Sequence, residues 1–190
     1  FKINDIIKII NKKYKIEDKK IILFLGRLDI EKRPLDLKIF EEILSENIQN
    51  ILVFVGEGPE KSKLQDFKKN SKFSSQILIT GRVPNFYDYA WIKLSDVYVV
   101  PGQVGLAIKQ AMLLKTPVII ADEHGVDSEV IKNDFTGLRF KKGCQSDLMI
   151  KYKKLKNNSQ FRQDIIDNSY KLIKKEHTLS NMTNSIVNFL

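Results

Sequence analysis

The sequence has little of what disulfide-rich, membrane-spanning or metal-binding proteins need. Its 190 residues include one cysteine, Cys144, so no disulfide can form within the chain, which is consistent with a reducing compartment. No apolar run approaches the roughly 20 residues that cross a bilayer as a helix. The histidines, His124 and His177, and Cys144 show no spacing typical of metal ligands, and no clustered Asp-x-Asp segment occurs. We therefore expect a cytoplasmic protein without a metal site.

Positive charge is plentiful but dispersed. The formal net charge is +9, and lysine supplies 27 of the 32 basic residues. Nucleic-acid-binding proteins usually gather such charges with aromatic residues or in a known module, and the sequence shows neither. The lysines are therefore interpreted as parts of solvated faces, and no nucleic-acid partner is expected. A hydrophobic content of 43% over this length suits one globular domain.

Five short apolar runs predict the strands of a buried sheet. Each is rich in Val and Ile and is apolar nearly throughout, which is typical of strands covered on both faces in a parallel sheet. The runs are IILFL (21–25), ILVFV (51–55), QILIT (76–80), DVYVV (96–100) and PVIIA (117–121). A weaker strand is expected at 138–141.

Segments with helical patterns separate these runs. They are 34–45, 59–69, 104–114 and 127–133, with a leading helix at 2–11 and an all-helical tail over 143–190. The alternation of strand and helix predicts an α/β fold with right-handed crossovers. We expect a doubly wound, parallel, six-stranded, Rossmann-like sheet in the order 3-2-1-4-5-6. It would form a single domain over 1–190, with its core at about 20–142.

That strand order places a binding site where the winding reverses, at the carboxyl ends of the first and fourth strands. The loop after the first strand is GRLDIEKR (26–33), which holds Arg27 and Lys32. The loop after the fourth strand is PGQVGL (101–106), which opens a helix. A helix start attracts anions, Gly105 allows close approach, and the two cations can hold phosphate oxygens. Together these features fit a diphosphate better than a carboxylate.

The GEGPE segment (56–60) is a weaker candidate for a dinucleotide site. It lacks the third glycine of G-x-G-x-x-G, since Lys61 stands there, and it follows the second strand rather than the first. We interpret it as a tight turn before a helix. Tyr87, Tyr89 and Trp91 are expected to pack a short helix against the sheet rather than to stack on a base.

The ordered set of these segments resembles a known family. FLGRLDIEKRP, VFVGEGPEKSKL, ITGRVPN, DVYVVPGQVGLAIKQAMLLKTPVIIAD and the distal EVI and DFTGLRF are similar to the C-terminal domain of GT-B glycosyltransferases of group 1, or family 4. The resemblance covers about residues 20–142, and the helical tail fits as well. It implies a retaining, metal-independent hexosyltransferase of polysaccharide or glycoconjugate synthesis, with no cofactor and with a UDP- or GDP-linked sugar as co-substrate.

The same resemblance implies a second domain. In the family, an N-terminal domain of similar size binds the acceptor, here a sugar or a lipid-linked sugar, and the reaction takes place in the cleft between the domains. A chain of 190 residues has room for one of the two domains. We therefore expect this donor-binding half to be inactive alone.

The resemblance also implies roles for single residues. Arg27 and Lys32 would hold the donor diphosphate and act in catalysis, because they stabilise the charge that gathers on the departing nucleoside diphosphate. Backbone amides near Gly105 would meet the phosphate next to the sugar, and Arg82 and Val83 would lie beside the base. The full donor-binding set is Gly26, Arg82, Val83, Gly102, Val104, Gly105, Leu106, Gln110 and Glu129.

Two positions depart from the family pattern. Family members commonly carry two glutamates eight positions apart, and here Gly102 and Gln110 stand in their places. The Gln110 amide can still bond the ribose hydroxyls, whereas Gly102 has no side chain to offer the donor sugar. Another residue substitutes, or the chain belongs to a branch with its own loop, or activity is reduced. We favour the branch, because the GRL and VGL segments and Lys32 are intact. The role of Glu129 is left open between site and support.

Alternatives from other classes stay open. A non-catalytic nucleotide-binding or interaction module derived from the same fold would keep the diphosphate loops without transfer activity. Half of a nucleotide-sugar epimerase would take its catalytic groups from the other domain. The dispersed lysines and a lipid-linked acceptor would also suit peripheral association with the inner face of the cell membrane.

Overall fold

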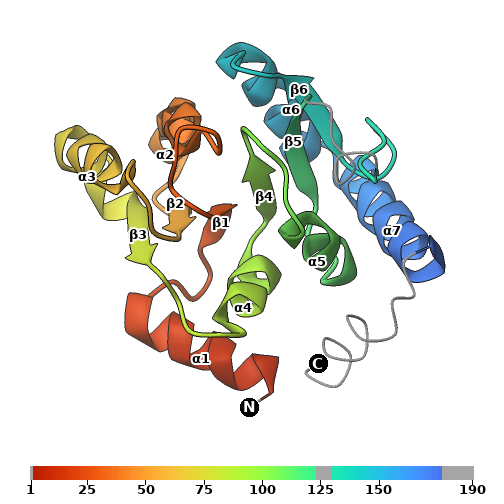
Figure 1. The fold of residues 1–190 in the computed structure, drawn as a ribbon, viewed down its shortest axis with the longest axis horizontal. Helices are drawn as coiled ribbons and strands as arrows, with labels where there is room; N and C mark the ends of the chain where they lie inside the picture. Colours follow the sequence, from red (N-terminus) through yellow and green to blue (C-terminus); the bar gives the residue numbers. More distant parts are fainter. Residues whose placement is uncertain (1, 123–129, 177–190) are drawn as a thin grey trace.

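The computed structural model describes residues 2–122 and 130–176, which form a parallel sheet between two layers of helices (Figure 1). The strands lie in the order β3-β2-β1-β4-β5-β6, and every neighbouring pair is parallel, as predicted. They are β1 (Lys20–Leu25), β2 (Asn50–Val55), β3 (Ile77–Gly81), β4 (Val97–Val100), β5 (Val118–Asp122) and β6 (Leu138–Lys141).

Helices connect the strands in the expected alternation. Those of the first half are α1 (Ile3–Tyr14), the 3₁₀ helix η1 (Pro34–Phe40), α2 (Glu41–Glu46), α3 (Lys61–Asn70), the short η2 (Ser74–Gln76) and α4 (Tyr87–Leu94). Those of the second half are α5 (Ala107–Leu113), α6 (Gln145–Asn157) and α7 (Ser159–Glu176). The predicted leading helix and helical tail are therefore present in the described part of the chain.

Three predicted helices differ from the observed ones. The segment 34–45 is split, because its first turns are 3₁₀ and only the part after Phe40 is α-helical. The helix expected at 104–114 begins three residues later, at Ala107, so the glycine loop is longer than predicted. Of the helix expected at 127–133, the described part is not helical, since Asn133 forms a β-bridge with Gly137.

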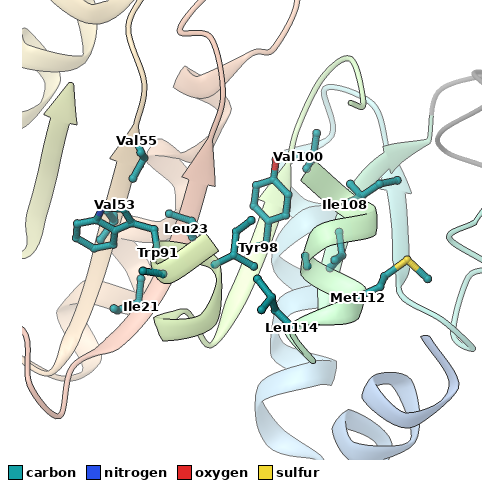
Figure 2. Packing of buried hydrophobic residues seen from close by; sticks show 14 of the residues in the cluster. Ile21, Leu23, Val53, Val55, Trp91, Tyr98, Val100, Ile108, Met112 and Leu114 are labelled. Atoms are coloured by element: carbon teal, nitrogen blue, oxygen red, sulfur yellow. The ribbon is translucent and has the colours of Figure 1, made fainter. Parts of the chain in front are cut away.

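Strands β1, β2, β4 and β5 bury alternate side chains in two separate cores, whereas the edge strand β6 buries Leu138 and Phe140 in one core only. In β1, Ile21 and Leu23 face the layer of α1, α4, α5 and α7, whereas Ile22 and Phe24 face η1, α2, α3 and α6. Figure 2 shows part of the first core, in which side chains of β1, β2 and β4 pack beneath α4 and α5. Burial of each such side chain contributes about 1.5–3 kcal/mol to stability, which is why the strand runs are apolar throughout.

Helix α4 is anchored by Trp91, whose side chain is fully buried. Its ring lies 5.4 Å from that of Tyr14, so α1 packs on the outer side of α4. The prediction that Trp91 packs a short helix against the sheet is confirmed.

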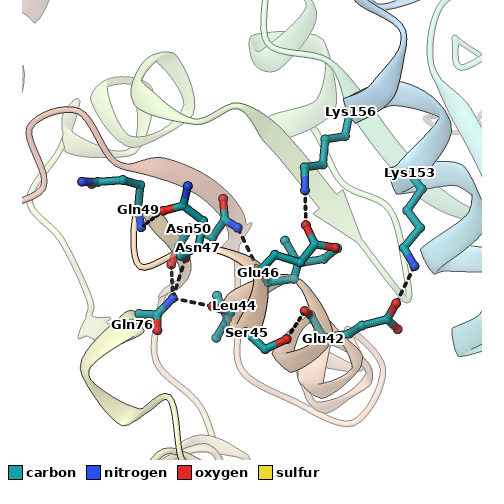
Figure 3. Close-up of polar contacts among 11 residues, drawn as sticks. Glu42, Leu44, Ser45, Glu46, Asn47, Gln49, Asn50, Gln76, Lys153 and Lys156 are labelled. Atoms are coloured by element: carbon teal, nitrogen blue, oxygen red, sulfur yellow. Dashed lines mark hydrogen bonds and ion pairs between the residues drawn. The ribbon is translucent and has the colours of Figure 1, made fainter.

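The turn before β2 is closed by a buried amide. Gln76 Nε2 donates to the carbonyl oxygens of Leu44, Asn47 and Asn50, at 2.9, 3.0 and 2.9 Å (Figure 3). Asn50 Nδ2 donates to Ile43 O at 2.7 Å. These bonds tie η2 and α2 to the amino end of β2, and so fix that edge of the sheet.

Candidate functional site

The strands β1 and β4 separate at their carboxyl ends. Whereas β1 pairs with β2 along its whole length, it pairs with β4 only through Ile22–Val97 and Leu23–Tyr98. Beyond that point the buried Tyr98 hydroxyl spans the gap and donates to Leu25 O at 2.9 Å. The opening lies where the winding of the sheet reverses, which is where doubly wound folds bind ligands. Sequence reasoning missed Tyr98, although a tyrosine in an aliphatic strand was a signal.

The loops that follow β1 and β4 are in direct contact. Gln103 N donates to Glu31 O at 3.0 Å, and Lys32 Nζ donates to Gln103 O at 2.8 Å. A Cβ on Gly105 would lie 3.7 Å from Lys32 Nζ. The structure therefore brings together the two segments that topology and sequence had paired.

Gly102 marks the closest approach of the two loops. A Cβ at this position would lie 2.0 Å from Glu31 O and 2.8 Å from the carbonyl carbon of Lys32, closer than atoms can come. Because both are backbone atoms in a bonded loop, they cannot move aside cheaply. The loop after β1 therefore occupies the space that a side chain at position 102 would need, including the glutamate expected from the family pattern.

Asp29 orders the loop after β1. Its carboxylate accepts the Lys32 backbone N–H at 2.9 Å and forms an ion pair with Arg27 Nε at 3.2 Å. The Arg27 side chain is 72% exposed, so its guanidinium stands at the open side of the loop with this carboxylate behind it. Sequence reasoning missed Asp29. The signal was an aspartate within a loop, because such a side chain often accepts a hydrogen bond from a backbone N–H a few residues later.

Arg33, which belongs to the same basic loop, points elsewhere. Its guanidinium pairs with Asp36 at 2.8 Å and would lie 3.3 Å from a Cβ on Gly143, in the turn before α6. Arg33 therefore supports the η1 side of the fold, and the loop presents Arg27 and Lys32 as its cations at the opening.

The GEGPE turn supports the loop from the other side. A Cβ on Gly56 would lie 1.8 Å from Gly26 O, and one on Gly58 would lie 2.3 Å from Leu28 O. Gly26 N donates to Val55 O at 3.0 Å, while the space beside the Gly26 Cα is open. The interpretation of 56–60 as a tight turn is confirmed, and it holds Gly26 at the opening.

The start of α5 forms the opposite wall. Val104 is half-buried against the core beneath α4 and α5, and Leu106 is 58% exposed. Ile108 N and Lys109 N already donate to Gly105 O and Leu106 O, at 3.3 and 3.1 Å, so the amides of residues 105–107 are the ones that an anion could reach. Further along the helix, Gln110 Nε2 lies 3.4 Å from the Tyr89 hydroxyl of α4. Gln110 is therefore placed between the two helices that flank the opening.

Arg82 and Val83 follow β3 and line a small cavity. It has a volume of about 180 Å³ and also includes Tyr14, Tyr87 and Trp91. A hydrogen bond from Lys61 lowers the pKa of the Glu57 carboxyl, and the Arg82 backbone N–H contributes to the same lowering. Through these contacts, Glu57 helps to position the segment that follows β3.

The remaining predicted residue, Glu129, lies outside the described residues. Within the described ranges, no group of three or more His, Cys, Asp or Glu side chains could hold a metal ion. No helix in the described part of the chain is long and apolar enough to pass through a bilayer.

Comparison with known proteins gives the family. Residues 5–172 match the family model described as glycosyl transferases group 1. An alpha-D-kanosaminyltransferase of Streptomyces kanamyceticus is 21% identical over 90% of this chain, and the chain spans 45% of that relative's length.

Solved structures share the fold. The C-terminal domain of a glycosyl transferase group 1 protein of Francisella tularensis has a TM-score of 0.77 at 20% identity, over 89% of this chain and 93% of that one. The Anabaena protein HepE, solved in complex with UDP, has a TM-score of 0.77 at 16% identity, over 99% of this chain and 54% of that one. The chain therefore belongs to the glycosyl transferases group 1 family, and its architecture is that of the C-terminal domain of a GT-B glycosyltransferase.

Proposed function

We propose that the chain is the nucleotide-sugar-binding half of a retaining, metal-independent hexosyltransferase, in which Arg27 and Lys32 act on the donor diphosphate. The contact between Lys32 Nζ and Gln103 O carries this proposal, because it holds a cation beside the start of α5. A diphosphate at this place would meet Arg27, Lys32 and helix amides at once. The complex of the similar Anabaena protein with UDP supports the same class of ligand.

The chemistry follows from where charge develops. When the bond between the sugar and the diphosphate breaks, negative charge gathers on the departing phosphate. Lys32 is already held in position before a ligand arrives, so little reorganisation accompanies the reaction. An ammonium group has three donors, so Lys32 can keep its bond to Gln103 O and still donate to a phosphate oxygen. The cations then supply the charge that a metal ion supplies in other transferases.

The rest of the donor would extend across the opening. Gln110 would bond the ribose hydroxyls with its amide, and the base would lie beside Arg82 and Val83, at the cavity that these residues share with α1 and α4. Gly26 and Leu106 would border the diphosphate, and Glu129 keeps an open role. Recognition of the donor sugar must differ from the common family pattern, because no side chain fits at Gly102.

The acceptor would bind to a second domain. The chain spans 45% of the length of its Streptomyces relative, which leaves room for a domain of similar size. We propose that this domain binds a sugar or lipid-linked acceptor for polysaccharide or glycoconjugate synthesis. The transfer reaction would take place in the cytoplasm, and at the inner face of the cell membrane when the acceptor is lipid-linked.

Titration calorimetry with UDP and with GDP tests the donor site. One of the two nucleotides should bind, and Arg27→Ala and Lys32→Ala should each weaken it about tenfold, the value of one lost charged hydrogen bond. Lys12→Ala on α1 is the matched control and should bind as the parent does. A folded sample that releases no heat with either nucleotide contradicts the proposal.

A non-catalytic module is the second candidate, because Gly102 stands where the family pattern expects a glutamate and leaves no room for a side chain. It would bind the nucleotide equally well, so binding does not separate the two. The full-length protein should transfer label from a nucleotide sugar to an acceptor, with retention at the anomeric carbon and in the presence of a chelator. Binding without transfer would favour the module, and a changed sugar nucleotide without transfer would favour the epimerase.

A further inference from the structure

A second polar cavity lies at the opposite end of the sheet from the proposed donor site. It has a volume of about 260 Å³ and opens between the amino ends of β1, β2 and β4 and the helices α6 and α7. Its lining includes Lys20 and Asp96 from the sheet, Tyr152 and Lys156 from α6, and Arg162 from α7. The donor loops follow the other ends of β1 and β4, so the two places share two strands but no residue.

The Tyr152 hydroxyl gives this cavity an unpartnered donor. Tyr152 is 7% exposed, and its ring packs edge-on against Phe40 at 5.0 Å. No residue in the described ranges forms a hydrogen bond with its hydroxyl. Burial raises the pKa of the phenol, so it stays protonated and can donate. Tyr152 lines the cavity, so an acceptor on a bound ligand can reach its hydroxyl.

The charges around the cavity leave one cation without a carboxylate. Lys156 pairs with Glu46 of α2, as Figure 3 shows, so these two charges cancel. Lys20 and Asp96 are 3.8 Å apart, and Asp96 Oδ2 is already engaged by Ile21 N at 2.8 Å.

Arg162 is the remaining cation. It donates to the backbone oxygen of Asp96, and among the described residues no carboxylate lies within ion-pair distance of it. Its other guanidinium donors and the Tyr152 hydroxyl therefore line the same cavity with no anionic partner. The sum over Lys20, Lys156, Arg162, Asp96 and Glu46 is one positive charge.

We propose that this cavity binds the phosphate group of a small phosphorylated metabolite, with Arg162 and Tyr152 as its donors. A guanidinium offers a fork of donors that matches phosphate oxygens, and the tyrosine adds a third donor from the other side. Val97, Leu155 and the ring of Tyr152 give the cavity an apolar wall for the neutral body of the ligand. The site lies at the far ends of the strands whose loops would hold the nucleotide, so the two ligands can bind at the same time.

Calorimetry with a hexose 6-phosphate, inorganic phosphate and the free hexose tests this site. The phosphate ester should bind most tightly, and the free hexose should give no heat. Arg162→Gln should weaken the ester about tenfold, as expected for one lost charged hydrogen bond, and Tyr152→Phe about threefold. Lys171→Gln, which removes an exposed charge from the same helix, should change nothing.

Saturating UDP or GDP separates this site from the donor site. If the ester binds in the proposed cavity, its affinity stays within about twofold when the nucleotide is present, and Lys32→Ala has no effect on it. Displacement by the nucleotide, or equal binding by Arg162→Gln and Tyr152→Phe, overturns the proposal and leaves the donor site untouched. Arg162 also donates a hydrogen bond to the backbone oxygen of Asp96, so thermal unfolding should check that Arg162→Gln is still folded. Tyr152→Phe removes no bond of the folded chain and keeps the test valid.

Discussion

Lys32 Nζ lies 2.8 Å from Gln103 O, although the two residues are 71 positions apart in the chain. The bond joins the loop after β1 to the loop after β4 at the place where the two strands separate. Gln103 N in turn donates to Glu31 O at 3.0 Å. A cation is therefore fixed beside a helix start by the backbone alone.

Lys32→Arg tests whether this geometry or only the charge matters. We expect Lys32→Arg to bind the nucleoside diphosphate about tenfold more weakly, because a planar fork cannot reproduce the contact with both Gln103 O and a phosphate. Calorimetric titration of the variant and the parent with the nucleoside diphosphate measures this difference in affinity. An affinity equal to that of the parent would show that a positive charge in this loop is sufficient.

Restoring the family glutamate at Gly102 should destabilise the fold rather than restore sugar binding. The Cβ of any residue there would lie 2.0 Å from Glu31 O, so Gly102→Ala and Gly102→Glu should each cost about 1–3 kcal/mol, as overpacking does. Chemical unfolding measures the loss.

Gly105→Ala is the matched control for Gly102→Ala. Its Cβ would meet only the flexible end of Lys32, at 3.7 Å, and stability should change by less than the Gly102 variants show. Equal stability of the Gly102 and Gly105 variants would mean that the two loops separate easily.

Tyr98→Phe should loosen the opening between β1 and β4. The hydroxyl is the group that reaches Leu25 O, and a buried carbonyl without its donor costs about 1–3 kcal/mol. The free energy of unfolding should fall by this amount, and nucleotide affinity should fall with it because Leu25 precedes Gly26. Tyr152→Phe, whose hydroxyl has no partner in the described ranges, should leave the free energy of unfolding unchanged.

Asp88 should make stability depend on pH in a direction unusual for an aspartate. Burial raises the pKa of its carboxyl above the ordinary 3.8, so the folded chain holds this proton to a higher pH than the unfolded chain does. The stability linked to Asp88 is therefore fully present below pH 3.8 and is lost as the pH rises through the folded value.

Asp88→Asn removes this dependence. Its Tm should exceed that of the parent by about 2 °C at neutral pH, and the difference should vanish near pH 3. Thermal unfolding across that range measures it, with the exposed Asp164→Asn as the control. A difference that does not change with pH would assign the effect to something other than the proton of Asp88.

Much of the fold could be predicted because its signals are local. The strands of a doubly wound sheet are buried on both faces, so each appears as a short apolar run. The alternation with helices indicates a doubly wound sheet, for which the observed order is a common one. The same order predicted that the loop containing Lys32 meets the loop containing Gly105. The 3₁₀ start of the second helix and the late start of α5 could not be predicted, because η1 packs against α3 and α6 and the segment before α5 is bonded to the loop after β1.

The sequence by itself determined the class of fold, the family and the pair of loops, since these follow from patterns within single segments and from their order. Only the tertiary structure decided that Gly102 has no room for a side chain, that Arg33 turns away to Asp36, and that Tyr98 spans the gap between two strands. The Gly102 and Tyr98 contacts join segments that are distant in the chain, and no local pattern encodes such a distance. Arg33 and Asp36 are only three positions apart, but the sequence did not show that Arg33 would pair there rather than join Arg27 and Lys32 at the opening.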